Sequence, residues 1–285
     1  MVAPQQARRA TLFVGGLALQ DLPAALASGA DIVCIDLEDA VPPQRKEEAR
    51  IAVVEAAKAV QLPKGVQLIA RVNGMLEPDG PLDVRALLAQ APAFGGFLLP
   101  KVVGPDEIRS AAAMCEQSGR SLDLYAIIET AEGLEHCVAI ARAHPMLRAL
   151  YFGGFDLSTA LGCEMAWEPL LYARSRVVHA AAMAGVQVID SPYADVADLE
   201  GLRSSCARVK SLGMTGRCAK HASQVAAIRE SFTPTAQEIR RARDIVAQFR
   251  QDPTRPLVHE GKLIELPAIK RLERIAAHAD GAAEE

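Results

Sequence analysis

Charged or polar side chains close most of the short apolar runs in this sequence. They are Asp36, Glu38 and Asp39, then Arg71 and Asn73, then Lys101, Glu129, Asp156, Asp190 with Tyr193, and Lys220 with His221. If the runs are the strands of one parallel barrel, their C-terminal ends meet at a single rim, where active sites lie in such barrels. Seven runs of eight end this way. We therefore expect these side chains to form a functional ring.

Glu129 and Asp156 close the fifth and sixth of these runs. Two carboxylates on neighbouring strands are well placed to share one cation. Mg²⁺ prefers oxygen ligands and often takes only one or two protein carboxylates, which leaves positions for substrate and water. We expect Glu129 and Asp156 to bind a divalent metal. The alternative is that each carboxylate pairs with a nearby arginine or caps a helix.

The basic residues of the ring have several readings. Arg71 could bind a carboxylate bidentately, through two parallel N–H groups of its planar guanidinium. It could instead form a structural ion pair with Glu38 or Asp39. Lys101 and Lys220 could act as Schiff-base nucleophiles only if they were desolvated. The acidic ring would keep both lysines charged, which disfavours that chemistry.

The elements that must position these residues follow a repeating pattern. Eight β-prone runs alternate with stretches that are mostly Ala-rich and helix-prone; they cover 11–16, 31–39, 67–73, 96–102, 122–130, 149–157, 186–193 and 216–224. Parallel strands need such crossover segments and are buried on both faces. The pattern predicts a (β/α)8 TIM barrel over residues 1–232. The pairs Gly15-Gly16 and Gly153-Gly154 do not match a nucleotide-binding pattern and indicate close backbone approach.

The pattern changes after Phe232. Thr235 and Glu238 have the spacing of a capping box, which predicts that a helix begins there. A polar stretch and a second amphipathic segment follow. We expect residues 233–285 to form a helical extension. It cannot bury its apolar face alone, so we expect it to pack on this barrel or on that of a neighbouring subunit.

Composition excludes several classes of protein. The chain of 285 residues has a net charge of −4, with acidic and basic residues intermixed, so it lacks the basic face of a nucleic-acid-binding protein. Its six cysteines form no C-x-x-C pair, and no apolar stretch approaches the ~20 residues of a membrane span. The N-terminus shows no signal-peptide core. We expect a cytoplasmic protein.

Several motifs resemble the HpcH/HpaI aldolase and citrate lyase superfamily, in its citrate lyase β-subunit-like branch. They are GADIVCIDLEDAVPPQRKEEAR (29–50), ARVNG (70–74), LLPKV (98–102), IIETAEGL (127–134), FGGFDLSTALG (152–162), IDSPYADVADLEGL (189–202) and GKLIELP (261–267). The resemblance covers nearly the whole chain. It implies a homo-oligomer, often a trimer or larger, that makes or breaks a carbon–carbon bond in a citryl-CoA- or malyl-CoA-like thioester.

The resemblance also assigns residues. It implies that Glu129 and Asp156 hold Mg²⁺ and that Arg71 binds the carboxylate of an oxaloacetate- or glyoxylate-like ketoacid. Gly154 and Lys101 are further candidates for substrate binding. Asp36, Glu38 and Asp39 would support the site through hydrogen bonds to the groups that touch the metal or substrate.

Four positions depart from the family pattern. The first strand is followed by Gly15 where the family usually has proline, and a nearby arginine is missing; Ala222 stands where the family has another proline. The departures at Gly15 and Ala222 leave an aldolase for free hydroxy-ketoacids as a rival to a coenzyme A-dependent lyase. A second rival is a non-catalytic or regulatory subunit, because the resemblance is to one subunit of a larger lyase complex. Glu265 replaces a family aspartate that completes the active site of a neighbouring subunit. Its alternative role is an exposed residue in the first turn of the last helix.

Overall fold

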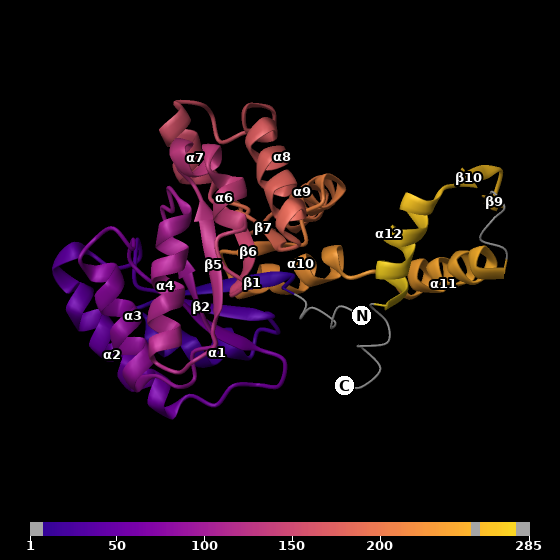
Figure 1. The fold of residues 1–285 in the computed structure, drawn as a ribbon. Helices are drawn as coiled ribbons and strands as arrows, with labels where there is room; N and C mark the ends of the chain where they lie inside the picture. The colour runs from indigo at the N-terminus through magenta and orange to yellow at the C-terminus, as the bar shows by residue number, and fades with distance from the viewer. Residues whose placement is uncertain (1–7, 252–256, 278–285) are drawn as a thin grey trace. The chain divides into compact units, whose positions relative to one another are not determined.

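Eight parallel strands close into a barrel in sequence order, β1 to β8 (Figure 1). The computed structural model describes residues 8–251 and 257–277. The strands are β1 (Ala10–Gly15), β2 (Ile32–Asp36), β3 (Gln67–Arg71), β4 (Gly96–Leu99), β5 (Asp123–Ile128), β6 (Leu147–Phe152), β7 (Gln187–Asp190) and β8 (Gly216–Ala219). Pairing of β1 with both β2 and β8 closes the ring. The predicted TIM barrel is confirmed.

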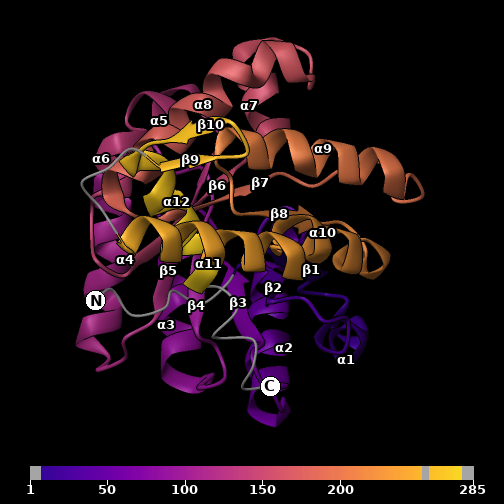
Figure 2. The ribbon, with the colours of Figure 1, turned by 90° about the vertical axis from the view of Figure 1, so that its right-hand side faces the viewer.

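Helices surround the barrel. They are α1 (Leu22–Leu26), α2 (Lys46–Ala59), α3 (Asp79–Gln90), α4 (Pro105–Gln117), α5 (Ala131–Glu135), α6 (Cys137–Ala141), α7 (Gly154–Leu161), α8 (Trp167–Ala184), α9 (Leu199–Leu212) and α10 (Val225–Phe232). Gly185 ends α8 at a φ of 72°, a left-handed conformation that glycine adopts without steric cost. Helices α9 and α10 lie side by side outside β8 (Figure 2). None of the helices in the described residues is both long and apolar enough to cross a membrane.

The strands bury both faces in two separate apolar clusters. Alternate residues point into the barrel, where Cys34, Leu98, Tyr125 and Tyr151 pack together. The residues between them point outward and pack against the helices. Because successive side chains of a strand face opposite sides, one inward residue fixes the facing of every other residue in that strand. This alternation decides which side chains reach the rim of the barrel.

All eight strands end earlier than the sequence pattern predicts, and β2 and β6 are the cases that bear most on the site. Strand β2 stops at Asp36, so Glu38 and Asp39 lie in the loop that follows it. Strand β6 stops at Phe152, and α7 begins at Gly154. Asp156 is therefore in the first turn of a helix and not at a strand end, which corrects the expected placement.

The chain divides into two compact units, one of them formed by residues 7–232 and the other including everything from Thr233 on. In the second unit, α11 (Ala236–Gln251) begins at the predicted capping box. Thr235 N–H donates to Glu238 Oε2 at 2.7 Å, and Glu238 N–H donates to Thr235 Oγ1 at 3.1 Å. Strands β9 (Leu257–His259) and β10 (Lys262–Ile264) form a hairpin that the sequence pattern did not predict, and α12 (Leu266–Ala277) follows it. An ion pair of 2.9 Å between Arg250 and Glu273 joins α11 to α12.

Candidate active site

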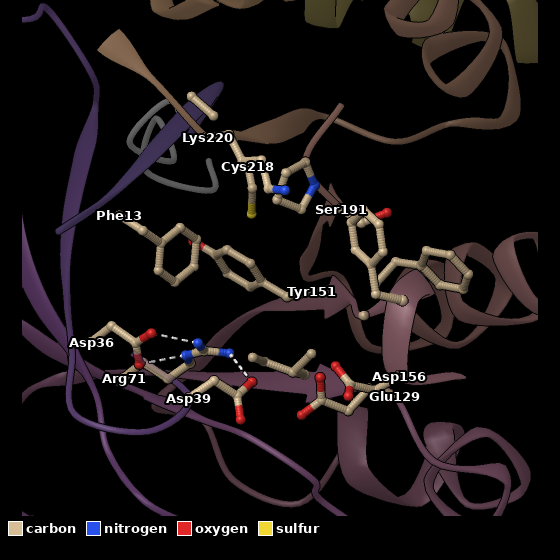
Figure 3. Close-up of a pocket in the computed structure, with 16 residues that line it drawn as sticks. Phe13, Asp36, Asp39, Arg71, Glu129, Tyr151, Asp156, Ser191, Cys218 and Lys220 are labelled. Atoms are coloured by element: carbon tan, nitrogen blue, oxygen red, sulfur yellow. Dashed lines mark hydrogen bonds and ion pairs between the residues drawn. The ribbon is translucent and has the colours of Figure 1, made fainter. Parts of the chain in front are cut away.

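A cavity of about 360 Å³ opens at the C-terminal ends of the barrel strands (Figure 3). Its lining includes Phe13, Asp36, Asp39, Arg71, Ile127, Glu129, Tyr151, Asp156, Ser191, Cys218 and Lys220. Most of these residues continue the inward-facing positions of their strands. Ile127 and Glu129 are two residues apart, as are Cys218 and Lys220. The cavity is therefore the upper end of the barrel interior.

Arg71, at the end of β3, is held by the acidic residues that follow β2. Its Nε donates to Asp36 Oδ1 at 2.8 Å and its Nη2 to Asp36 Oδ2 at 2.5 Å. Its Nη1 pairs with Glu38 Oε2 at 3.0 Å and reaches Asp39 Oδ2 at 3.4 Å. Burial lowers the pKa of Arg71, but these carboxylates outweigh it and raise that pKa above its ordinary value. Arg71 therefore forms the expected ion pairs with Glu38 and Asp39 and also lines the cavity.

Glu129 follows β5 and is almost completely buried, with 3% of its surface exposed. Its Oε1 accepts a hydrogen bond of 2.7 Å from the main-chain N–H of Lys101. Burial, reinforced by the negative charges of Glu38 and Asp156, raises the pKa of Glu129 to about 8. The carboxylates of Glu129 and Asp156 lie next to one another at the edge of the cavity (Figure 3). A buried carboxylate beside another one favours a bound cation over two bare charges.

Glu38 forms ion pairs with both Arg71 and Lys101. Lys101 Nζ lies 2.5 Å from Glu38 Oε1, and the Glu38 side chain is buried. Burial raises the pKa of Glu38 above its ordinary value, against the opposing charges of Arg71 and Lys101. The hydrogen bond to Glu38 raises the pKa of Lys101. This ion pair favours the charged ammonium of Lys101, whereas a Schiff-base nucleophile must be a neutral amine.

Two glycines bring the backbone close to these groups. A Cβ built at Gly153 would lie 2.7 Å from Glu129 Oε2. A Cβ at Gly154 would lie 2.7 Å from Met165 Cε and 3.0 Å from Phe152 Cε1. The close approach predicted for this glycine pair is confirmed. The contacts of Gly154 are packing contacts, and its expected role in substrate binding stays a prediction.

Other members of the expected ring lie elsewhere. Asp190 is fully buried outside the barrel interior, where it pairs with Arg217 and, at 3.5 Å, with Arg174. The expectation that it faces the rim is wrong, because Asp190 follows the inward-facing Ile189 and so points the opposite way. Ser191, one residue later, lines the cavity instead.

The remaining ring members make local contacts. Tyr193 OH donates to Asp198 Oδ2 at 2.8 Å. His221 Nδ1 is 2.9 Å from Ser223 Oγ within the same turn. Asn73 is buried and donates from Nδ2 to the main-chain oxygen of Leu37 at 3.1 Å. Asn73 therefore braces the loop that carries Glu38 and Asp39.

Sequence reasoning missed several lining residues. The centre of the Phe13 ring lies 5.5 Å from the guanidinium carbon of Arg71. Tyr151 and Cys218 occupy inward positions of β6 and β8. These residues are apolar or weakly polar, so they do not stand out among the charged residues that follow the strands. Alternation along each strand would have found Cys218, which precedes Lys220 by two residues.

Glu265 is exposed and immediately precedes α12 in the second unit. Its main-chain oxygen accepts hydrogen bonds from the N–H groups of Ala268, at 2.9 Å, and Ile269, at 3.1 Å. This geometry matches the expected position in the first turn of the last helix. A role for Glu265 in the site of a neighbouring subunit stays a prediction.

The donor set of the cavity fits a hard cation. Within residues 8–251 and 257–277, no group of three or more His, Cys, Asp or Glu side chains forms a closed metal site. Glu129 and Asp156 offer two carboxylates, the number that Mg²⁺ commonly takes when water and substrate complete its shell. Including these two, the site holds five carboxylates (Asp36, Glu38, Asp39, Glu129 and Asp156) and three cations (Arg71, Lys101 and Lys220). This excess of negative charge would be relieved by a divalent cation.

Comparison with known proteins places the chain in a family. The profile of the HpcH/HpaI aldolase/citrate lyase family matches residues 9–222. L-malyl-CoA/beta-methylmalyl-CoA lyase of Cereibacter sphaeroides is 30% identical over an alignment covering 97% of this chain and 96% of the relative. Mitochondrial citramalyl-CoA lyase of Mus musculus is 29% identical, covering 95% and 86%. A crystal structure of CitE from Mycobacterium tuberculosis with magnesium, acetoacetate and coenzyme A is 25% identical, has a TM-score of 0.81, and covers 96% of this chain and 98% of that one. The chain belongs to the HpcH/HpaI aldolase/citrate lyase family.

Proposed function

We propose that this protein is a Mg²⁺-dependent carbon–carbon lyase for a 3-hydroxyacyl-CoA thioester of the malyl-CoA or citramalyl-CoA type. The products would be a shorter acyl-CoA and a ketoacid. The observation that carries the proposal is the buried Glu129 beside Asp156, in one cavity with Arg71. The activities named for the two lyase relatives and the ligands named for CitE support it.

Glu129 and Asp156 would hold the metal. When bound there, Mg²⁺ would stabilise the negative charge that develops on the substrate oxygens. Glu129 is prepared for this role, because the N–H of Lys101 fixes its Oε1. The other carboxylate oxygen lies on the side of Gly153, where the missing side chain leaves room.

Arg71 would orient the carboxylate of the ketoacid half of the substrate. Asp36 occupies Nε and Nη2 and locks the plane of the guanidinium. The longest ion pair of Arg71 is the 3.4 Å contact of its Nη1 with Asp39, whose side chain is 53% exposed. A substrate carboxylate would replace this contact at little cost, because exposed ion pairs contribute little. Phe13, Ile127 and Tyr151 would exclude water from the bond that breaks.

Cleavage requires two proton movements. The substrate hydroxyl loses its proton as the carbon–carbon bond breaks, and the thioester enolate carbon gains one. Asp36 is saturated by Arg71 and by the N–H groups of Glu38 and Ala40, which suits it to positioning. We propose that the half-exposed Asp39 and Glu265 of a neighbouring copy are the carboxylates that exchange protons with substrate.

We further propose that the enzyme acts in the cytoplasm as a homo-oligomer. All six cysteines are free thiols, and five of them are buried, as suits a reducing compartment. In this proposal residues 1–232 bind the substrate, and residues 233–285 contribute Glu265 across an interface between copies.

An assay with a panel of substrates tests the function. Malyl-CoA, citramalyl-CoA, citryl-CoA and the corresponding free hydroxy-acids would be supplied with Mg²⁺ or with EDTA, and ketoacid release and acyl-CoA formation would be measured. We expect turnover of one or more thioesters only with the metal. Turnover of free hydroxy-acids alone would establish the coenzyme A-independent aldolase, which the missing arginine near Gly15 favours. Turnover that EDTA leaves unchanged would contradict the metal site.

A further inference from the structure

Lys101 has a backbone conformation that residues other than glycine rarely adopt. Its φ is +53°, in the left-handed region, where the β-carbon of an L-residue is crowded. A lysine is kept in such a conformation only where its surroundings enforce it, and residues of this kind cluster at functional sites. The position of Lys101, two residues after β4 and beside Glu129, makes it such a case.

The loop around Lys101 is anchored on both sides. Glu107 accepts hydrogen bonds from Val103 N–H, at 3.2 Å to Oε1, and from Gly104 N–H, at 2.8 Å to Oε2. His136 Nδ1 is 2.8 Å from the main-chain oxygen of Val103. The oxygen of Val102 packs against Gly133 of α5, where a Cβ would lie only 2.2 Å away. These contacts with α4 and α5 hold the strained residue in place.

In this conformation Lys101 contacts two acidic residues, Glu129 and Glu38. Its main-chain N–H donates to Glu129 Oε1 at 2.7 Å, and its Nζ lies 2.5 Å from Glu38 Oε1. Glu38 in turn contacts Arg71 Nη1 at 3.0 Å. One residue therefore links the carboxylate proposed to hold the metal to the arginine proposed to bind the substrate. Its ammonium is already engaged by Glu38, with Asp39 at 3.7 Å.

We infer that Lys101 is a positioning residue, which presets Glu129 through its amide and holds Glu38 against Arg71 through its ammonium, and that it is not a substrate contact. The inference rests on the proposed function, since it assigns Lys101 to the metal and carboxylate sites named there. It replaces the substrate-binding role that we expected for Lys101 from the sequence. Groups that orient metal ligands typically contribute about 10–100-fold to metal affinity or activity.

The test compares Lys101→Met, Lys101→Gly, Glu38→Gln and the double variant Lys101→Met/Glu38→Gln. Lys101→Gly guards against misfolding, because glycine accepts a positive φ and keeps the amide N–H. Lys58→Met, which removes an exposed lysine paired with Glu55 on α2, is the control. Mn²⁺ affinity without substrate, kcat and KM are measured for each, and circular dichroism checks the fold.

Lys101→Met and Lys101→Gly both keep the amide N–H but lose the ion pair with Glu38 that helps to hold this amide against Glu129. We therefore expect both to weaken Mn²⁺ binding and lower kcat by about 10-fold or more each, with KM nearly unchanged. Adding Glu38→Gln to Lys101→Met should cause no further loss of Mn²⁺ affinity or kcat, or should restore part of it. The double variant no longer buries a Glu38 carboxylate that has lost its ammonium partner. A raised KM with unchanged Mn²⁺ affinity, or losses that multiply in the double variant, would make Lys101 a substrate contact and overturn the inference. If the wild-type protein bound no Mn²⁺, the proposed function itself would fail.

Discussion

Gly153 packs directly against Glu129. A Cβ built at Gly153 would lie 2.4 Å from the Cβ of Glu129 and 2.7 Å from its Oε2, closer than real side chains come. The backbone that leads from β6 into α7 thus touches the buried carboxylate and also carries Asp156 three residues later. The same turn sets the position of both proposed metal ligands.

Gly153→Ala should displace Glu129 and weaken the metal site while the barrel still folds. A misplacement of about 1 Å in a catalytic group costs about 100-fold in rate, and we expect a loss in kcat of that order. The measurement is turnover together with Mn²⁺ affinity. Gly104→Ala is the matched control, because a Cβ there would have its nearest neighbour at 3.9 Å. Equal activity of the two variants would show that Glu129 adapts without loss.

Glu129→Gln and Asp156→Asn should each weaken divalent-metal binding by 10-fold or more and remove most activity, since an amide oxygen carries no net charge to offset that of the ion. Titration with Mn²⁺ or calorimetry with Mg²⁺ gives the affinity. Glu132→Gln, at an exposed position of α5, should bind metal like the wild type. Unchanged metal affinity in both site variants would place the metal elsewhere.

Arg71→Lys should keep the fold and lose most activity. A lysine keeps the charge but cannot engage both oxygens of Asp36, nor stack as a planar group near Phe13. We expect kcat/KM to fall about 100-fold, through loss of orientation. Steady-state kinetics and a thermal melt measure the two effects. Turnover close to wild type would mean that Arg71 serves only the structure of the acidic loop.

Asp123 ties the opposite end of the barrel to the N-terminal segment. It accepts hydrogen bonds from Arg148 Nε at 2.8 Å, from Gln67 Nε2 at 3.0 Å and from Arg8 Nη2 at 2.8 Å. Burial raises the pKa of Asp123, but these partners outweigh it and hold that pKa below its ordinary value. A lowered folded-state pKa stabilises the protein above the unfolded pKa, and this contribution is lost as pH falls through the folded pKa.

Asp123→Asn should therefore lower the free energy of unfolding at neutral pH by about 2 kcal/mol. Below about pH 4, the unfolded pKa of aspartate, this variant should lose less stability than the wild type does. Urea denaturation at several pH values measures both effects. Asp106→Asn is the control, because its ion pair with Arg109 is exposed. An unchanged pH dependence in Asp123→Asn would show that other carboxylates dominate acid stability.

Glu265→Gln tests whether the site is shared between copies of the chain. We expect this variant and Glu129→Gln to be inactive as pure oligomers. Mixed oligomers should recover activity, because some sites then combine an intact Glu129 with an intact Glu265 from another copy. Subunit exchange is verified with differently tagged chains. Proven mixed oligomers without activity, or a fully active Glu265→Gln protein, would assign Glu265 only to the start of α12.

Local sequence signals were sufficient to locate the eight strands, although each strand ends earlier than predicted. Buried runs bounded by turn residues can be recognised from neighbouring positions alone, and the capping box at Thr235 is a contact between residues three apart. The places of Glu129 and Asp156 after the fifth and sixth runs suggested their pairing, and the family motifs agreed with it. The hairpin of β9 and β10 was missed because its strands are only three residues each, too short to show alternation.

Tertiary structure decided which way the strand-end residues face and what they touch. Asp190 looked equivalent to Glu129 in sequence, yet the register of β7 in the closed barrel turns it toward Arg217 and away from the cavity. The positive φ of Lys101 depends on contacts with α4 and α5, and its pairing with Glu38 joins residues 63 positions apart. Such relations arise only when the barrel closes, because closure sets the facing of each strand and brings distant loops to one rim.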